Sequence, residues 1–258
     1  MTANLSGHLS GTFGGTWAWF EFHLWYVIPV VLALLVGSLF PVTKHIRDAS
    51  LRRQYYLLQG ITLVSAIVGA KLTFVVAETG WPWAPWPGWL VVLASGRSIV
   101  GALIFGLLGA ECAKPLLSYP LPPNDRFAAI LPLSIAIGRI GCLANGCCRG
   151  IPYEGIVAIR YDDGIARHPA PLYEMAFHLA ACAVALVLVR RGRLKGCVFS
   201  VYLMAYGLFR FGTEFLRETP KTFATFSAYQ WLALAMVVLG ASFLAKRYSK
   251  WNIGEAAV

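Results

Sequence analysis

Apolar stretches of membrane-spanning length recur along the whole chain, and they limit its fold more than any other feature. The hydrocarbon core of a bilayer is about 30 Å thick, which about 20 helical residues cross. We expect seven transmembrane helices, at 22–40, 55–77, 98–117, 127–146, 172–189, 196–215 and 227–245. Hydrophobic residues make up 58% of the sequence and charged residues 13%, a composition typical of a chain surrounded by lipid. The sequence therefore predicts an all-α, polytopic membrane protein with a single transmembrane domain over residues 1–258.

The loops between these stretches indicate the orientation of the chain. With the N-terminus outside, thirteen Lys and Arg residues fall in inner loops and six in outer loops. Because cytoplasmic loops are enriched in Lys and Arg, we expect the N-terminus outside and the C-terminus in the cytoplasm. The same distribution explains the net charge of +10. We therefore expect membrane lipids, and no nucleic acid, as partners.

Three outer segments follow from this orientation, at 1–21, 78–97 and 147–171. The first twenty residues contain no Lys or Arg, so they lack the basic region that begins a cleavable secretory signal. The segment 78–97 is rich in Trp and Pro. Its tryptophans suit a loop at the outer membrane interface, and a gate over a substrate cleft is the alternative role.

Ionisable residues inside the predicted helices mark the place where chemistry is expected, because a charge within a span costs at least a few kcal/mol. Arg139 lies too near the middle of 127–146 to reach the interface cheaply. Arg210 and Glu214 are one helical turn apart and are expected to pair, either for structural neutralisation or for catalysis. Two guanidiniums with too few carboxylates imply an anion brought by a ligand, since Arg binds phosphate in bidentate fashion. A phospholipid headgroup reached from the outer side is such an anion.

Four segments resemble the motifs of one enzyme family. Residues 138–150 read Gly-Arg-Ile-Gly-Cys-Leu-Ala-Asn-Gly-Cys-Cys-Arg-Gly and are similar to the signature of the prolipoprotein diacylglyceryl transferases. Further family motifs follow the same order at Trp25 and Tyr26, at 167–174 (Arg-His-Pro-Ala-Pro-Leu-Tyr-Glu) and at 206–217. The combination is specific, and it covers most of the chain.

The resemblance implies an enzyme of the bacterial inner membrane that transfers the diacylglyceryl group of phosphatidylglycerol to the lipobox cysteine thiol of a prolipoprotein. Glycerol phosphate leaves, the prolipoprotein signal peptide is the protein partner, and no cofactor or metal is expected. By position, Arg139 and Arg210 would act on the phosphate and Glu214 would hold Arg210. His168 is carried over as a catalytic candidate. Arg97, at the outer interface, joins the matched positions in the expected substrate site: Tyr26, Gly141, Asn145, Gly150, Tyr173, Glu174 and Tyr206.

The third predicted helix departs from the family pattern. The family usually carries Ser-x-His-Gly-Gly there, and its histidine is a proposed base, whereas this chain has Val100 at that position. An acceptor thiol with a pKa of about 8.5 is only slightly ionised at neutral pH, so some group must favour the thiolate. General-base action by His168 and the field of the arginines are the two alternatives.

The signature itself departs at Cys142, where the family usually has Asn, and at Cys147, where it usually has Glu. A related glyceryl or phosphoglyceryl transferase with a different acceptor is therefore an alternative function. Together with Cys148, these cysteines have three alternative roles: plain packing, then a disulfide, then a metal site, against which the spacing and the lack of a fourth ligand count. A redox membrane protein built on this cluster is the alternative from another functional class.

Overall fold

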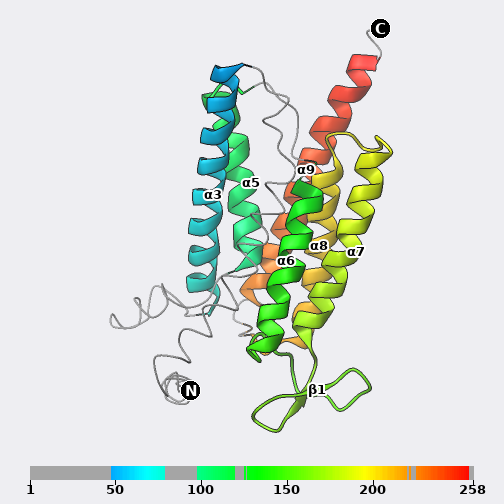
Figure 1. The fold of residues 1–258 in the computed structure, drawn as a ribbon. Helices are drawn as coiled ribbons and strands as arrows, with labels where there is room; N and C mark the ends of the chain where they lie inside the picture. The colour runs from blue at the N-terminus through cyan, green and yellow to red at the C-terminus, as the bar shows by residue number, and fades with distance from the viewer. Residues whose placement is uncertain are drawn as a thin grey trace, which may run out of the picture. The chain divides into compact units, whose positions relative to one another are not determined.

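The computed structural model describes residues 48–78, 98–119, 125, 127–219, 221 and 225–255 (Figure 1). These residues form six α-helices, one 3-10 turn and one two-stranded sheet. The chain divides into two compact units, each described by itself: one includes Phe127–Val187, and the other the described residues of Pro41–Arg126 and Leu188–Val258. The predicted helix 22–40, the predicted outer segment 1–21 and residues 79–97 of the predicted Trp-rich loop lie outside the described residues.

Helix α3 (Ala49–Glu78) begins the second of these units as described. Its start is fixed by Asp48, whose carboxylate accepts a 2.9 Å hydrogen bond from the Ser50 N–H, as an N-cap residue does. This contact lowers the pKa of Asp48 and explains why the helix begins before the predicted position 55. Large apolar side chains are exposed along α3, a surface that suits lipid contact: Tyr56, Leu57, Ile61, Leu63, Val64, Ile67, Val68, Leu72 and Val76.

Helices α3 and α5 (Ile99–Leu116) lie side by side (Figure 1). Gly101 permits this approach, because a Cβ atom there would lie 2.4 Å from the Gly69 carbonyl oxygen. Small residues are the usual means of close helix packing in membranes, where apolar burial alone does not favour protein over lipid. Ser98 caps α5 by accepting a 3.2 Å hydrogen bond from the Gly101 N–H.

Three further elements complete this unit: α8 (Val198–Thr213), the 3-10 turn η2 (Glu214–Leu216) and α9 (Ala228–Glu255). Helices α8 and α9 pack against each other, and Tyr206 and Met236 are fully buried there. Asp125 caps the start of α8, because its carboxylate accepts the N–H groups of Gly196 and Val198. These N–H groups precede or begin the helix and have no intrahelical acceptor.

The other unit contains α6 (Phe127–Ala144), β1 (Ile159–Arg160), β2 (Ala166–Arg167) and most of α7 (Ala170–Arg190). Helix α6 ends in a Schellman motif, in which the Gly146 N–H bonds to the Leu143 carbonyl and the Cys147 N–H bonds to the Cys142 carbonyl, both at 3.1 Å. Gly146 has a φ of +58°, a left-handed conformation that favours glycine. The helix therefore stops at Ala144, two residues before its predicted end.

The described residues confirm the predicted all-α class, and the predicted outer loop 147–171 adds one short β-hairpin. Strands β1 and β2 pair antiparallel, with Ile159 opposite Arg167 and Arg160 opposite Ala166. Each strand has only two residues, too few for an alternating apolar pattern to reveal it in the sequence.

Five described helices are long and apolar enough to cross a membrane: Ala49–Ala77, Ile99–Leu116, Phe127–Ala144, Ala170–Arg190 and Ala228–Arg247. They confirm a helical, multi-pass membrane protein and five of the predicted helices. Helix α8 occupies the predicted span 196–215 but has 16 residues, fewer than the roughly 20 that cross a bilayer core. The count of seven helices and the orientation of the termini stay predictions.

Candidate functional site

A buried ion pair joins α6 to α7. The Arg139 guanidinium donates a hydrogen bond to the Glu174 carboxylate, and the two residues are 7% and 1% exposed. Arg139 also donates to the Cys142 sulfur at 3.5 Å. Arg139 is therefore buried, as its place in the sequence predicts, and its partner comes from the motif segment 167–174. A charge pair of this kind holds both side chains in fixed orientations.

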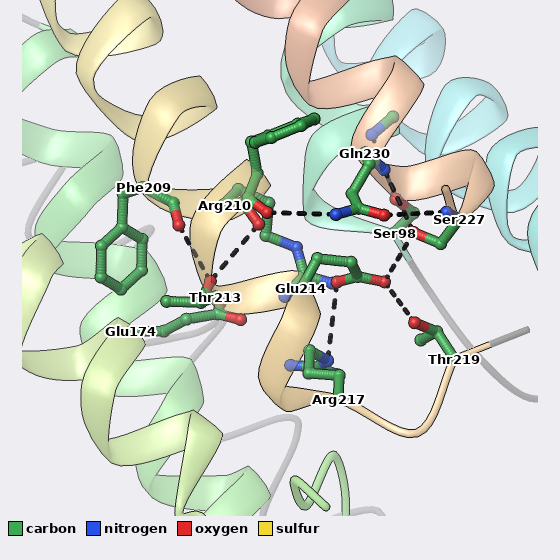
Figure 2. A network of polar contacts seen from close by, with 12 residues as sticks. Ser98, Glu174, Phe209, Arg210, Thr213, Glu214, Arg217, Thr219, Ser227 and Gln230 are labelled. Carbon is green, nitrogen blue, oxygen red and sulfur yellow. Dashed lines mark hydrogen bonds and ion pairs between the residues drawn. The ribbon is translucent and has the colours of Figure 1, made fainter. Parts of the chain in front are cut away.

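A second buried pair lies at the end of α8. Arg210 Nη2 is 2.8 Å from Glu214 Oε2, which confirms the predicted i, i+4 contact. Glu214 is fully buried, and its other carboxylate oxygen accepts hydrogen bonds from the hydroxyls of Thr219 at 2.6 Å and Ser227 at 3.0 Å (Figure 2). The Arg210 guanidinium also lies 5.6 Å from the centre of the Tyr229 ring, within cation–π range. The carboxylate is thus fixed from several elements, and it fixes the guanidinium in turn.

Two arginines share one carboxylate at two places in the chain. Arg217 Nε lies 3.9 Å from the same Glu214 oxygen that Arg210 contacts. In the other unit, Asp163 Oδ2 accepts hydrogen bonds from Arg149 at 2.9 Å and from Arg167 at 3.2 Å. In each set, one carboxylate is contacted by two guanidiniums.

These pairings correct the charge argument made from the sequence. Arg139 and Arg210 were expected to have too few carboxylates, but each has its own buried carboxylate partner. The sequence did not reveal this because Glu174 lies 35 residues from Arg139, a separation that carries no information about distance in space.

His168 is held in a defined orientation between β2 and α7. Its Nδ1 lies 3.0 Å from the Tyr173 hydroxyl, and its ring stacks on Tyr153 with centroids 3.9 Å apart. Its carbonyl accepts a 2.9 Å hydrogen bond from the Gly150 N–H. If Nδ1 carries the proton and donates to Tyr173, Nε2 is the nitrogen that accepts a proton. Three predicted site residues, His168, Tyr173 and Gly150, are therefore in contact.

The signature asparagine closes the end of α6. Asn145 donates its backbone N–H to the Gly141 carbonyl at 3.0 Å and its side-chain amide to the same oxygen at 2.8 Å. Both residues lie in the predicted site, and the structure brings them together. The side-chain amide is thus a second donor to a carbonyl that already accepts the last i→i−4 bond of the helix.

Three cysteine sulfurs converge just beyond this end of α6. The Sγ atoms of Cys142, Cys147 and Cys148 all lie within 4.8 Å of one another, and none of the three is in a disulfide. Hydrogen bonding to Cys142 and Cys148 and burial of the thiol raise the pKa of Cys147. Cys148 has a φ of +58°, a left-handed conformation that is uncommon outside glycine, asparagine and aspartate. The cluster is therefore held on a constrained turn at the end of α6.

Three predicted site residues remain, and the structure describes one of them. Tyr206 is fully buried on α8, one helical turn before Arg210, and stacks on Tyr202 with ring centroids 6.3 Å apart. Tyr26 and Arg97 lie outside the described residues.

The sequence analysis missed His178. This histidine is fully buried on α7, four residues after Glu174, so both residues lie on one face of the helix. Only Lys, Arg and Glu inside the predicted helices were taken as ionisable candidates. A histidine one turn from a buried carboxylate was the signal that would have found it.

Comparison with known proteins identifies the family to which these motifs belong. A family profile described as prolipoprotein diacylglyceryl transferase matches residues 19–246. The chain belongs to this family. The resemblance stated from the four sequence segments is thereby confirmed, and the redox alternative is not favoured.

Several named relatives of this family are similar to the chain, and each is a phosphatidylglycerol–prolipoprotein diacylglyceryl transferase. The relative from Cupriavidus metallidurans is 38% identical over 143 residues, which cover 52% of this chain and 53% of the relative. The relative from Bordetella parapertussis is 35% identical over 152 residues, or 55% and 56%. The relative from Thermotoga maritima is 28% identical over 243 residues, or 88% and 82%. The chain thus spans about half the length of the first two relatives and most of the third.

Within the family, this member places an apolar residue where the usual third-helix histidine is expected. Val100 is 2% exposed near the start of α5, where its side chain packs in the core of its unit. A valine has no group that accepts a proton. Any base for an acceptor thiol must therefore come from another position in this chain or from the substrates.

Proposed function

We propose that this family member transfers the diacylglyceryl group of phosphatidylglycerol to the lipobox cysteine thiol of a prolipoprotein and releases glycerol phosphate. The observation that carries the proposal is the match of residues 19–246 to the family, together with buried Arg–Glu pairs at two of its motif positions. The named activity of the relatives supports the same reaction. These relatives include ones aligned over about half of their length and one aligned over most of its length.

The arginines are assigned to the phosphate of the lipid. Phosphatidylglycerol has a phosphodiester with one negative charge, and we assign it to Arg210 and Arg217, the two guanidiniums that share the Glu214 carboxylate. As the carbon–oxygen bond breaks, a second negative charge develops on the departing phosphate oxygen. Fixed guanidiniums in a site that excludes water stabilise that charge without reorganising. Glu214 holds Arg210 in position, and we assign the same task to Glu174 for Arg139.

His168 is the proposed acceptor of the thiol proton. Its ring is oriented by Tyr173 and Tyr153, which leaves Nε2 for the substrate when Nδ1 donates to Tyr173. A thiol attacks efficiently only as thiolate. An oriented imidazole therefore supplies a base in a chain that lacks the third-helix histidine.

The remaining assignments are proposed on position in the motifs and in the predicted span order. Gly141, Asn145 and Gly150 shape the backbone beside the lipid, and the other assigned contacts are at Tyr26, Arg97, Tyr173 and Tyr206. We further propose one transmembrane domain of seven helices in the bacterial inner membrane, with the N-terminus outside and the C-terminus cytoplasmic. Segments 1–21, 78–97 and 147–171 would lie on the outer side, where lipoprotein precursors present their lipobox.

The direct test measures transfer by the full chain in detergent or in membranes. Phosphatidylglycerol labelled in its diacylglyceryl group is mixed with a lipobox peptide. The peptide should gain the label through a thioether bond. Arg139→Ala should lower the rate at least about 100-fold, the scale expected for losing a preorganised charge. Arg160→Ala is the matched control, since Arg160 is exposed on the hairpin and bonds only to the Gly164 carbonyl among the described residues.

Two outcomes would contradict the proposal in different ways. Full activity in Arg139→Ala would remove the assigned role of that residue. Release of glycerol phosphate from the labelled lipid, with no label on the peptide, would mean that the acceptor is a different molecule.

A further inference from the structure

The thiols of Cys142, Cys147 and Cys148 are brought together by the local fold. In the Schellman motif at the end of α6, the Cys147 N–H bonds to the Cys142 carbonyl at 3.1 Å, which stacks residue 147 over residue 142. The left-handed backbone of Cys148 then turns the next side chain toward the same point. A strained conformation at a non-glycine residue is found most often where a site requires it.

The geometry of the three sulfurs fits a thiophilic metal ion. Zinc binds cysteine sulfur at about 2.3 Å, so the sulfurs of a tetrahedral site lie about 3.8 Å apart. The three Sγ atoms lie within 4.8 Å of one another, and shifts of about 1 Å would bring them to that spacing. The Arg139 guanidinium, 3.5 Å from the Cys142 sulfur, would offset part of the negative charge of bound thiolates.

Three protein ligands are the pattern of a catalytic zinc site, which keeps its fourth position for water or substrate. The lack of a fourth ligand counted against a metal in the sequence, where only structural sites were considered. The reaction proposed above has a substrate with the matching ligand, a cysteine thiol. A thiol that coordinates zinc is deprotonated outright, and metal coordination is one of the ways in which a nucleophile is activated.

We propose that Cys142, Cys147 and Cys148 bind a zinc ion whose fourth position takes the thiol of the acceptor cysteine. The metal-binding half of this inference stands on the cluster alone, and the acceptor half rests on the proposed function. It also accounts for Val100 at the position of the usual histidine, because the metal removes the need for a base on α5. His168 then receives the proton that zinc displaces.

The step balances without an oxidant or reductant. The acceptor S–H loses its proton on coordination, and the sulfur attacks the glyceryl carbon that is bonded to the phosphate oxygen. The carbon–sulfur bond forms as the carbon–oxygen bond breaks, and the bonding electrons leave with the phosphate oxygen. His168 takes up the released proton and passes it to the glycerol phosphate or to solvent, and zinc keeps its charge throughout.

The first experiment asks whether the site binds metal, with cobalt(II) as the spectroscopic probe for zinc. The full chain is purified in detergent under reducing conditions and titrated with cobalt(II). We expect one ion per chain, with sulfur-to-cobalt charge-transfer bands and the visible bands of tetrahedral cobalt. Cys147→Ser should lose most of the charge-transfer intensity, whereas Cys182→Ser should keep it, because Cys182 is a buried cysteine of α7 outside the cluster.

A measurement on the unaltered chain keeps the inference testable if the serine variant folds poorly. X-ray absorption of the zinc-loaded protein should give three sulfur neighbours at about 2.3 Å and a fourth when the lipobox peptide is added. A peptide with serine in place of its cysteine should leave three. No thiolate bands with cobalt(II), or a disulfide among the three cysteines in the protein as isolated, would overturn the metal site.

The two proposals fail in distinguishable ways. Transfer to the peptide by a chain that binds no metal would refute the zinc site and leave the transferase standing. Metal binding without any transfer, or without a fourth sulfur when peptide is present, would retain the site and refute its link to the acceptor.

Discussion

Two buried arginines are neutralised in contrasting ways. Arg210 pairs with Glu214, four residues later, at 2.8 Å, and the contact forms within one continuous run of helix and 3-10 turn. Arg139 pairs with Glu174, 35 residues later and on another helix. The first pair is a product of local helix geometry. The second exists only when α6 and α7 are packed.

The difference predicts different consequences for stability and function. The local pair persists as long as α8 and η2 are helical, and Glu214 also accepts two hydroxyl hydrogen bonds. The cross-helix pair ties two family motifs together, so losing one partner leaves a charge buried between separately placed helices. A buried charge without its partner is among the most destabilising changes known in proteins. The cross-helix pair should therefore be the more sensitive of the two.

Removing one member of the cross-helix pair should give the largest effect. Arg139→Met removes the guanidinium that pairs with the buried Glu174 carboxylate, and we expect a loss of about 3–5 kcal/mol in unfolding free energy. The double variant Arg139→Met with Glu174→Leu should recover most of that stability, because an apolar pair of similar volume removes both charges. Denaturant titration in detergent measures the stability, and neither variant should transfer label to the peptide in the assay. A single variant as stable as the double one would break the comparison.

Weakening the local pair should cost less. Glu214→Gln removes the charge but keeps an oxygen that accepts from Thr219 and Ser227, so we expect a loss of about 1–3 kcal/mol. Transfer should also slow, because Arg210 loses the carboxylate that orients it. The same titration and assay apply. A stability loss that exceeds that of Arg139→Met would reverse the order of the two pairs.

Removing a supporting hydroxyl sharpens the comparison further. Ser227→Ala deletes the 3.0 Å hydrogen bond to Glu214 and should cost about 0.5–1.5 kcal/mol, the usual net value of one hydrogen bond. Ser242→Ala is the matched control on α9, since the Ser242 hydroxyl bonds to its own helix at the exposed Val238 carbonyl. Equal losses in both variants would mean that the Glu214 network adds nothing to the pair.

The two ion pairs that Asp163 makes with Arg149 and Arg167 set the lower limit of the series. Hydrogen bonding from the Ile165 N–H, with Arg149 and Arg167 nearby, lowers the pKa of Asp163 below its usual 3.8. A lowered pKa makes its contribution present above pH 3.8 and progressively lost as the pH falls through the folded value. Protection of the hairpin amides against hydrogen exchange, relative to the intrinsic rate at each pH, should therefore fall below that pH, while Asp163→Asn should show little of this change. Unfolding of the helices should be unaffected in both.

The two pairs also show how far the sequence predicts the site. Spacing alone identified the Arg210–Glu214 contact, because residues four apart on a helix are neighbours wherever the helix lies. Burial of Arg139 followed from its place in an apolar stretch. Its partner did not, since nothing in the sequence selects Glu174 over another carboxylate. The convergence of the cysteines could be predicted in part from the sequence. Gly146 is the kind of residue that ends a helix in a Schellman motif, and that motif brings the residues on either side of it together.

By itself, the sequence determined that lipid surrounds the chain, that its spans are helical and to which family it belongs. Apolar stretches of bilayer length admit only helices there, because lipid offers no partners for backbone polar groups, and motif order placed the chain in its family. Tertiary packing alone decided which carboxylate neutralises Arg139, that Glu214 is shared with Arg217, and that Asp163 is shared by two arginines. The physical reason is that helix geometry fixes distances over one or two turns, whereas the distance between two helices depends on how their side chains fit together.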